Sequence, residues 1–189
     1  MTILGTIRSK GVPVPPKRIR EIRMIVTKLR DIFGIRNRSY CDIVQILEYF
    51  GSTFLPDYAY EIVSDSDPLL NGKFAETFPQ EQIIRIKESV YNKACEGDGL
   101  SRFTIAHEFG HLFLRHKEDA PFARLMQYLP RPLEIWRDAE WQADVFAAEF
   151  LMPYEIVKGM STQEICNSCG VSRSAAETRR QKLKKPNWQ

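Results

Sequence analysis

Long apolar runs are absent from this 189-residue sequence. No stretch approaches the roughly 18–20 apolar residues of a membrane-spanning helix, so we expect no membrane contact. The first 18 residues hold no apolar segment of about 7–15 residues, and we therefore predict no signal peptide and a cytoplasmic location. Cysteine is scarce, with four residues in the chain. Without a secretion signal, we expect them to be reduced thiols.

Internal repeats and low-complexity tracts are also missing. Hydrophobic residues make up 43% of the chain and charged residues 27%, a balance that excludes wholesale disorder and is typical of a soluble globular protein. The length suits one domain with a small appendage. We predict a basic leader and helix over 1–38, a core over 39–155 and a C-terminal tail over 156–189.

The net charge of +3 conceals an uneven distribution. Residues 1–38 carry ten basic and two acidic side chains. Residues 39–171 carry eleven basic and twenty-one acidic side chains, and residues 172–189 carry six basic side chains and one acidic side chain. Basic ends around an acidic middle can indicate nucleic-acid contact, and they can equally be solvated helix faces. Charge alone leaves both interpretations open.

Apolar spacing predicts an α+β fold, a small sheet with helices packed on it. Helices are expected from about 19 to Gly34, from a Ser39 cap to Gly51, over 102–115 and over 133–152, with two short helices within 162–185. Alternation predicts strands over 59–63 and 82–86, and residues 92–101 are expected to form a loop.

The segment His107-Glu-Phe-Gly-His111 lies within an apolar stretch of helical spacing. Residues four apart share one face of a helix, so both imidazoles can bind one Zn²⁺ ion. Glu108 stands beside them and can take a proton from a zinc-bound water, as in the zinc peptidases that carry this motif. Two partly exposed histidines with a satisfied glutamate are the structural alternative.

A catalytic zinc needs a third protein ligand and one position left for water. The metzincin spacing would require a histidine where Lys117 stands, so that class is excluded. His116 lies five residues beyond His111, and we expect it to cap the helix end. Glu134 and Glu149 are further candidates, although the first suits a helix start and the second an exposed face.

The predicted helix over 133–152 offers a better ligand. Glu140 and Asp144 are four residues apart and share a face. This pattern fits a glutamate that binds zinc and an aspartate that accepts the other N–H of a ligand histidine. Ala143 and Ala147 are small enough to let this helix approach the first one closely. We therefore favour Glu140 as the third ligand.

RFTIAHEFGHLFL followed by EWQADVFAAEFLMP resembles the ImmA/IrrE family of zinc metallopeptidases, closely over about residues 80–155. The resemblance implies a gluzincin-like core, with zinc on His107, His111 and Glu140 and with Glu108 as the catalytic base. Members of the family cleave or inactivate XRE-type helix-turn-helix repressors in bacteria, phages and mobile elements. Many of them carry Asn where this chain has Asp144, and either side chain can accept an imidazole N–H.

Residues 161–185 are typical of a helix-turn-helix-like hairpin, with Gly170 in the turn and Ser172 as a cap. One interpretation is DNA contact through basic residues of the second helix: Arg173, Arg179, Arg180 and Lys182. The other is that the hairpin packs on the core. Cys166 and Cys169 form a single pair, too few for a structural zinc site.

These observations predict a zinc endopeptidase whose protein substrate is a DNA-binding repressor. Tyr128, Arg137 and Tyr154 are candidates for stabilising the oxyanion, and the strand over 82–87 could bind substrate if it borders the cleft. A regulator that binds DNA or protein without catalysis, and a toxin-like partner of an antitoxin, are the rival hypotheses.

Overall fold

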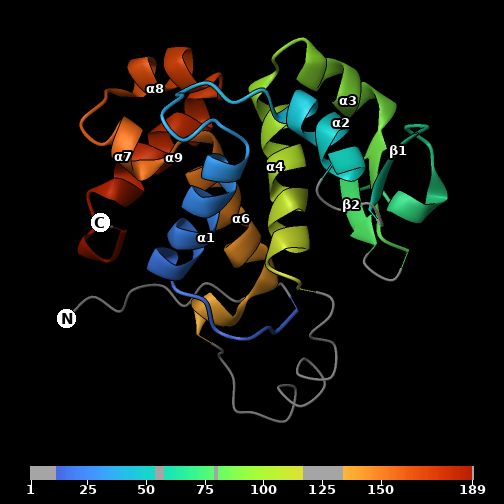
Figure 1. The fold of residues 1–189 in the computed structure, drawn as a ribbon, viewed down its shortest axis with the longest axis horizontal. Helices are drawn as coiled ribbons and strands as arrows, with labels where there is room; N and C mark the ends of the chain where they lie inside the picture. Colours follow the sequence, from blue (N-terminus) through green and yellow to red (C-terminus); the bar gives the residue numbers. More distant parts are fainter. Residues whose placement is uncertain (1–11, 54–57, 79–80, 117–133, 189) are drawn as a thin grey trace.

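The computed structural model describes residues 12–53, 58–78, 81–116 and 134–188. Three helices lie side by side at its centre: α1 (Ile19–Ile32), α4 (Gly99–Phe113) and α6 (Ala139–Leu151). Figure 1 shows the sheet with α2 (Ile43–Thr53) and α3 (Glu88–Cys95) on one side of this group. The short helices α7 (Tyr154–Val157), α8 (Thr162–Cys169) and α9 (Arg173–Leu183) lie on the other side. None of the described helices is long and apolar enough to cross a membrane. The predicted α+β class is confirmed.

The described sheet has three strands: β1 (Ala59–Val63), β2 (Ala75–Phe78) and β3 (Ile83–Lys87), in the order β1-β3-β2. β1 runs parallel to β3, and β2 runs antiparallel to it. The strand over 82–87, which could bind substrate if it bordered the cleft, is therefore the central one, because β3 has a neighbour on each side. The edge strands of this sheet are β1 and β2, and β2 is not among the strands that sequence patterning predicted.

Several element boundaries differ from those expected. Residues 88–95 form α3, where part of a loop was predicted. α2 begins at Ile43 and not near Ser39, because the side chain of Asp42 accepts a hydrogen bond from the Gln45 amide. α6 begins at Ala139, because Asp138 is extended and its carboxylate caps the Trp141 amide at 3.0 Å.

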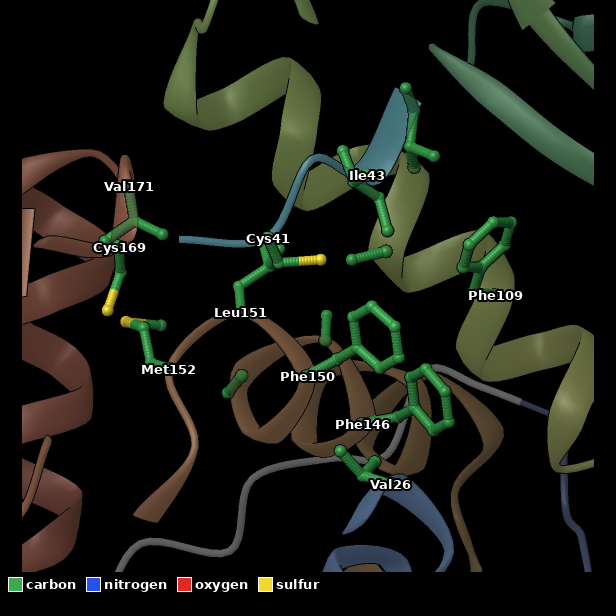
Figure 2. Packing of buried hydrophobic residues seen from close by; sticks show 14 of the residues in the cluster. Val26, Cys41, Ile43, Phe109, Phe146, Phe150, Leu151, Met152, Cys169 and Val171 are labelled. Carbon is green, nitrogen blue, oxygen red and sulfur yellow. The ribbon is translucent and has the colours of Figure 1, made fainter. Parts of the chain in front are cut away.

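The helices α4 and α6 cross at Gly110 and Ala143. A Cβ added to Gly110 would stand 2.8 Å from the Ala143 Cα and 3.1 Å from its carbonyl oxygen. Only glycine therefore fits at this crossing. Beside it, Phe150 packs edge-on against Phe109 and stacks on Phe146, as Figure 2 shows.

Fully buried arginines bind the ends of elements to one another. Arg30 donates to the carbonyl of Phe150 at 2.5 Å, and Arg102 donates to the carbonyls of Cys41 and Cys169 at 2.6 and 3.1 Å. Arg102 also donates to Gly170, whose φ of +61° turns the chain between α8 and α9. The C-terminal hairpin is thus fastened to α4 through its turn.

A buried ion-pair network joins α6 to α1 and α9. The Glu149 carboxylate is 1% exposed and lies 3.0 Å from Arg23 and 2.9 Å from Arg179. Arg179 also donates to the Met152 carbonyl, and Arg23 donates to the Trp188 carbonyl. The single carboxylate balances cations from two other helices.

We expect Gly110→Ala to destabilise the protein and to weaken metal binding. A better helix former would ordinarily stabilise a helix, but here its methyl group meets backbone atoms, and overpacking costs about 1–3 kcal/mol. Thermal unfolding and metal content measure the two effects. Adding Ala143→Gly removes only a Cβ contact at 3.2 Å, so full rescue by that second change would contradict the account.

Glu149→Gln should lower the free energy of unfolding by about 3 to 5 kcal/mol, because it leaves the buried Arg179 and the partly buried Arg23 without a balancing charge. Urea denaturation provides the measurement. Glu155→Gln is the matched control, since Glu155 pairs with Lys158 at an exposed site where an ion pair contributes little. Equal effects of the two substitutions would show that the buried network is not a stability determinant.

Candidate active site

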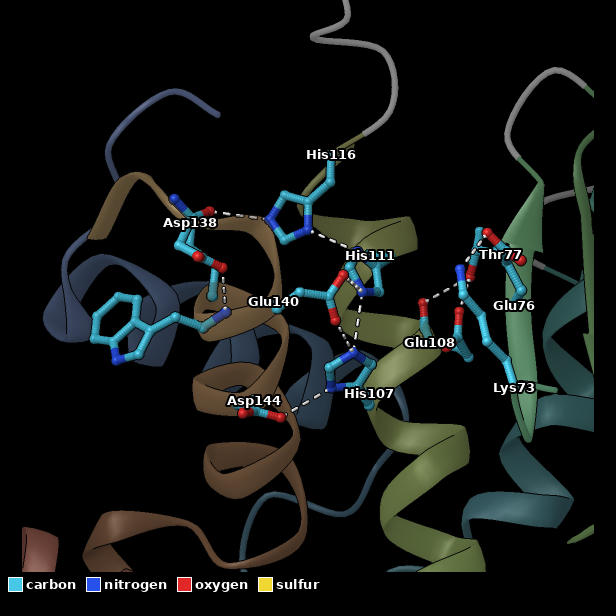
Figure 3. A network of polar contacts seen from close by, with 12 residues as sticks. Lys73, Glu76, Thr77, His107, Glu108, His111, His116, Asp138, Glu140 and Asp144 are labelled. Carbon is cyan, nitrogen blue, oxygen red and sulfur yellow. Dashed lines mark hydrogen bonds and ion pairs between the residues drawn. The ribbon is translucent and has the colours of Figure 1, made fainter. Parts of the chain in front are cut away.

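The crossing of α4 and α6 brings three predicted ligands together. His107 and His111 lie one turn apart on α4, and Glu140 faces them from the first turn of α6 (Figure 3). Their ligand atoms all lie within 4.8 Å of one another. Among the described residues, this trio could hold a metal ion.

The spacing of these atoms fits a tetrahedral metal site. The two Nε2 atoms are 3.0 Å apart, and the Glu140 carboxylate oxygens lie 3.2 Å from that of His107 and 3.5 Å from that of His111. Tetrahedral bonds of about 2.0–2.1 Å to zinc would set ligand atoms roughly 3.3 Å apart. Two imidazoles and one carboxylate also form a common ligand set of catalytic zinc.

Asp144 occupies the place expected for it, one turn beyond Glu140. Its carboxylate oxygen lies 3.0 Å from the Nδ1 atom of His107. The Nδ1–H of the histidine donates to this oxygen, so Nε2 is the ring nitrogen that faces His111 and Glu140 and that a metal ion would contact. Asp144 thereby orients a candidate ligand through the ring nitrogen that does not face His111 and Glu140.

The electrostatics of the trio favour a positive charge between the side chains. Burial would lower the pKa of His107, but hydrogen bonds with Asp144 and Glu140 outweigh burial and raise that pKa to about 10. The neighbouring imidazoles of His107 and His111, which lie against its carboxylate, hold the pKa of Glu140 well below its usual range. The carboxylate therefore stays ionised, and the surroundings attract either a proton or a metal cation.

Glu108 lies beside the trio and is 7% exposed. The hydroxyl of Thr77 on β2 donates to its carboxylate at 2.7 Å, as Figure 3 shows. Both residues line a cleft of about 520 Å³ that also contains the three candidate ligands. Val12 and Lys73 border the same cleft. Thr77 was not predicted as a site residue, because no pattern within its own strand connects it to α4.

The other candidates for the third ligand lie elsewhere. Glu134 is exposed and pairs with Arg137 at 3.0 Å. Glu149 is neither a ligand nor on an exposed face, because it is buried between Arg23 and Arg179. Glu140 is the acid that the structure brings to the two histidines.

His116 does not cap the helix, contrary to expectation. α4 ends at Phe113, and Arg115 has a φ of +58°, so the chain turns back toward α6. His116 is 2% exposed, and its Nδ1 atom lies 3.0 Å from the Nδ1 atom of His111. Burial and the neighbouring His111 lower the pKa of His116 to about 3, so its imidazole is neutral.

Two of the three oxyanion candidates, Arg137 and Tyr154, lie away from the site. Tyr128 lies outside the described residues. Arg137 pairs with Glu134, and the Tyr154 ring lies under the Arg23 guanidinium, 4.2 Å from its centroid, beside a different and smaller pocket. The structure thus provides no support for Arg137 or Tyr154 in this role.

The basic residues predicted to contact nucleic acid are divided between two environments. Arg173 and Arg180 are exposed on α9, and Lys182 is half-buried with its ammonium 4.8 Å from the Trp188 ring centroid. Arg179 is 1% exposed and paired with Glu149. Arg179 thus lies inside the protein, on the face of α9 that packs on the core.

Comparisons with known proteins agree with this geometry. The model of the IrrE N-terminal-like domain, Peptidase_M78, matches residues 75–179, from β2 to α9. None of the curated proteins matches the chain. A solved structure of a Mycobacterium tuberculosis transcriptional regulator superposes with a TM-score of 0.61 at 18% identity, a similarity that concerns the fold alone. The match covers 89% of this chain and 48% of that one, so this chain spans about half of the regulator's length.

We predict that the protein binds about one zinc ion per chain and that His107→Ala or Glu140→Ala abolishes this binding. Each change removes one of three protein ligands. Metal content after dialysis provides the measurement. Glu134→Ala is the control, because its carboxylate lies outside the trio. Full metal occupancy in Glu140→Ala would show that the third ligand has been misassigned.

Proposed function

The chain belongs to the IrrE N-terminal-like family of Peptidase_M78, and from this premise we propose that it is a zinc-dependent endopeptidase that cleaves an XRE-type helix-turn-helix repressor. The observation that carries the proposal is the convergence of His107, His111 and Glu140 beside Glu108 in one cleft. Such a set suits hydrolysis of a peptide bond. The repressor as substrate follows from the family resemblance.

Each residue of the cleft has a defined part in this proposal. His107, His111 and Glu140 would hold the zinc ion, which when bound lowers the pKa of a water molecule toward about 7 and polarises a carbonyl. Glu108 accepts the proton of the attacking water and passes it to the leaving amine. The hydroxyl of Thr77 holds the Glu108 carboxylate in place.

The substrate peptide would lie along β2. Residues 73–77 line the cleft, and β2 is the outer strand of the described sheet on that side. An extended peptide beside an edge strand presents its carbonyl groups at regular intervals. This position replaces the one predicted for residues 82–87, which lie in the middle of the sheet.

Glu108→Gln should abolish repressor cleavage while leaving zinc content and folding unchanged. The substitution keeps the size of the side chain and removes the base, and general-base assistance typically contributes about 10²–10⁴-fold. The chain is co-expressed with a tagged XRE-type repressor, and the repressor fragments are detected by immunoblot. Glu96→Gln, an exposed change on the C-terminal side of α3, is the control.

Fragments that form with the wild-type chain and with Glu96→Gln, but not with Glu108→Gln, would support the peptidase. Relief of repression by wild type and Glu108→Gln alike, without any fragment, would instead favour a regulator that acts by binding.

A further inference from the structure

We propose that His116 and Gln142 form a relay that fixes the tautomer of His111, and that the N-terminal segment over residues 12–17 anchors this relay. The inference rests on the metal site of the proposed function and adds two positioning residues to it. It follows from which atoms along the relay can donate a hydrogen bond and which can only accept one.

The relay begins at the Gln142 side chain, which is fully buried. Its amide nitrogen lies 2.9 Å from the Pro15 carbonyl oxygen and 2.7 Å from that of Trp136. Carbonyl oxygens only accept hydrogen bonds, so the NH₂ group must face them. The opposite orientation of the amide would place the Gln142 side-chain oxygen against the carbonyl oxygens of Pro15 and Trp136, with no proton between them. The Gln142 carbonyl oxygen therefore faces His116.

The second step sets the proton position on His116. The Gln142 oxygen lies 3.0 Å from the Nε2 atom of His116 and accepts a hydrogen bond, so Nε2 must carry the proton. In a neutral imidazole the other nitrogen is then an acceptor. That atom, Nδ1, faces the Nδ1 atom of His111 at 3.0 Å.

The third step sets the proton position on His111, a candidate metal ligand. Because Nδ1 of His116 accepts, Nδ1 of His111 must donate, and the lone pair of His111 then lies on Nε2. This is the atom that faces His107 and Glu140. His116 thus does for His111 what Asp144 does for His107. A neutral acceptor suits a site that is 2% exposed, where an additional carboxylate would lose its hydration.

The anchor of the relay lies in backbone that belongs to two distant parts of the chain. Three backbone hydrogen bonds join these parts. The Val14 amide donates to the Arg137 carbonyl at 2.9 Å, and the Lys17 amide donates to the Trp136 carbonyl at 3.0 Å. The Ala139 amide donates to the Val12 carbonyl at 3.1 Å. These bonds hold the Pro15 and Trp136 carbonyls on either side of the Gln142 amide. The N-terminal segment is therefore part of the support of the metal site.

His116→Phe tests the relay, because a phenyl ring fills the space and accepts no such hydrogen bond. We expect zinc affinity to fall by about 10–100-fold, as measured by competition with a chromophoric chelator. His116→Asn restores an acceptor near the position of Nδ1 and should recover part of the loss. Gln142→Met should weaken zinc binding about tenfold, whereas Gln181→Met, an exposed change on α9, should not.

The tautomers give a readout that loss of packing would not produce. In ¹⁵N NMR spectra of the metal-free wild type, we expect the proton of His111 on Nδ1 and that of His116 on Nε2. Gln142→Met should give a mixture of tautomers at His111. A wild-type His111 with its proton on Nε2, or zinc affinity unchanged in both His116→Phe and Gln142→Met, would overturn the proposal.

The wild-type spectrum decides the matter even where a variant does not fold. The relay and the proposed function can also fail separately. Glu108→Gln should retain the wild-type tautomers and zinc affinity, so a chain that shows this pattern but cleaves no repressor would refute the peptidase and leave the relay standing.

Discussion

The close crossing of α4 and α6 is the constraint on which the rest of the structure depends. Gly110 and Ala143 allow the two backbones to meet. His111 follows Gly110 directly, and Asp144 follows Ala143, so contact at this point places the polar faces of the two helices opposite each other. If a methyl group at Gly110 pushed the two helices apart, Glu140 would move away from the histidines, and the three side chains could no longer all reach one metal ion at bond distance.

Two kinds of buried charge surround this crossing, and their partners distinguish them. Arg30, Arg102 and Arg179 bind backbone carbonyls at the ends of helices, and Glu149 balances cations from α1 and α9. These groups hold elements together. At the cleft, the carboxylates of Glu140 and Asp144 have histidines as partners, and the Nε2 atoms of His107 and His111 lie 3.0 Å apart beside Glu140. That difference separates structural charge from a site suited to a cation.

Sequence patterning predicted the trio because each half of the site is local: two histidines four residues apart, and an acid four residues before another acid. It could not predict contacts made across the chain. Four residues of β2 carry too little periodicity to be recognised, and they become a strand through pairing with β3. His116 was assigned to a helix end because the early stop of α4 and the left-handed Arg115 cannot be deduced from local spacing. The burial of Glu149 and Arg179 likewise depends on which helix packs against them.

Metal binding at the trio would be coupled to folding in this architecture. The candidate ligands come from two helices, and their orientation depends on Asp144, on His116 and, through Gln142, on a segment near residue 15. No part of the unfolded chain holds these groups together, so a bound ion stabilises the folded state by mass action. Three carboxylates, those of Glu108, Glu140 and Asp144, also lie around one cleft. A divalent cation would reduce their mutual repulsion, so the arrangement suited to hydrolysis is also the one that gains most from the metal.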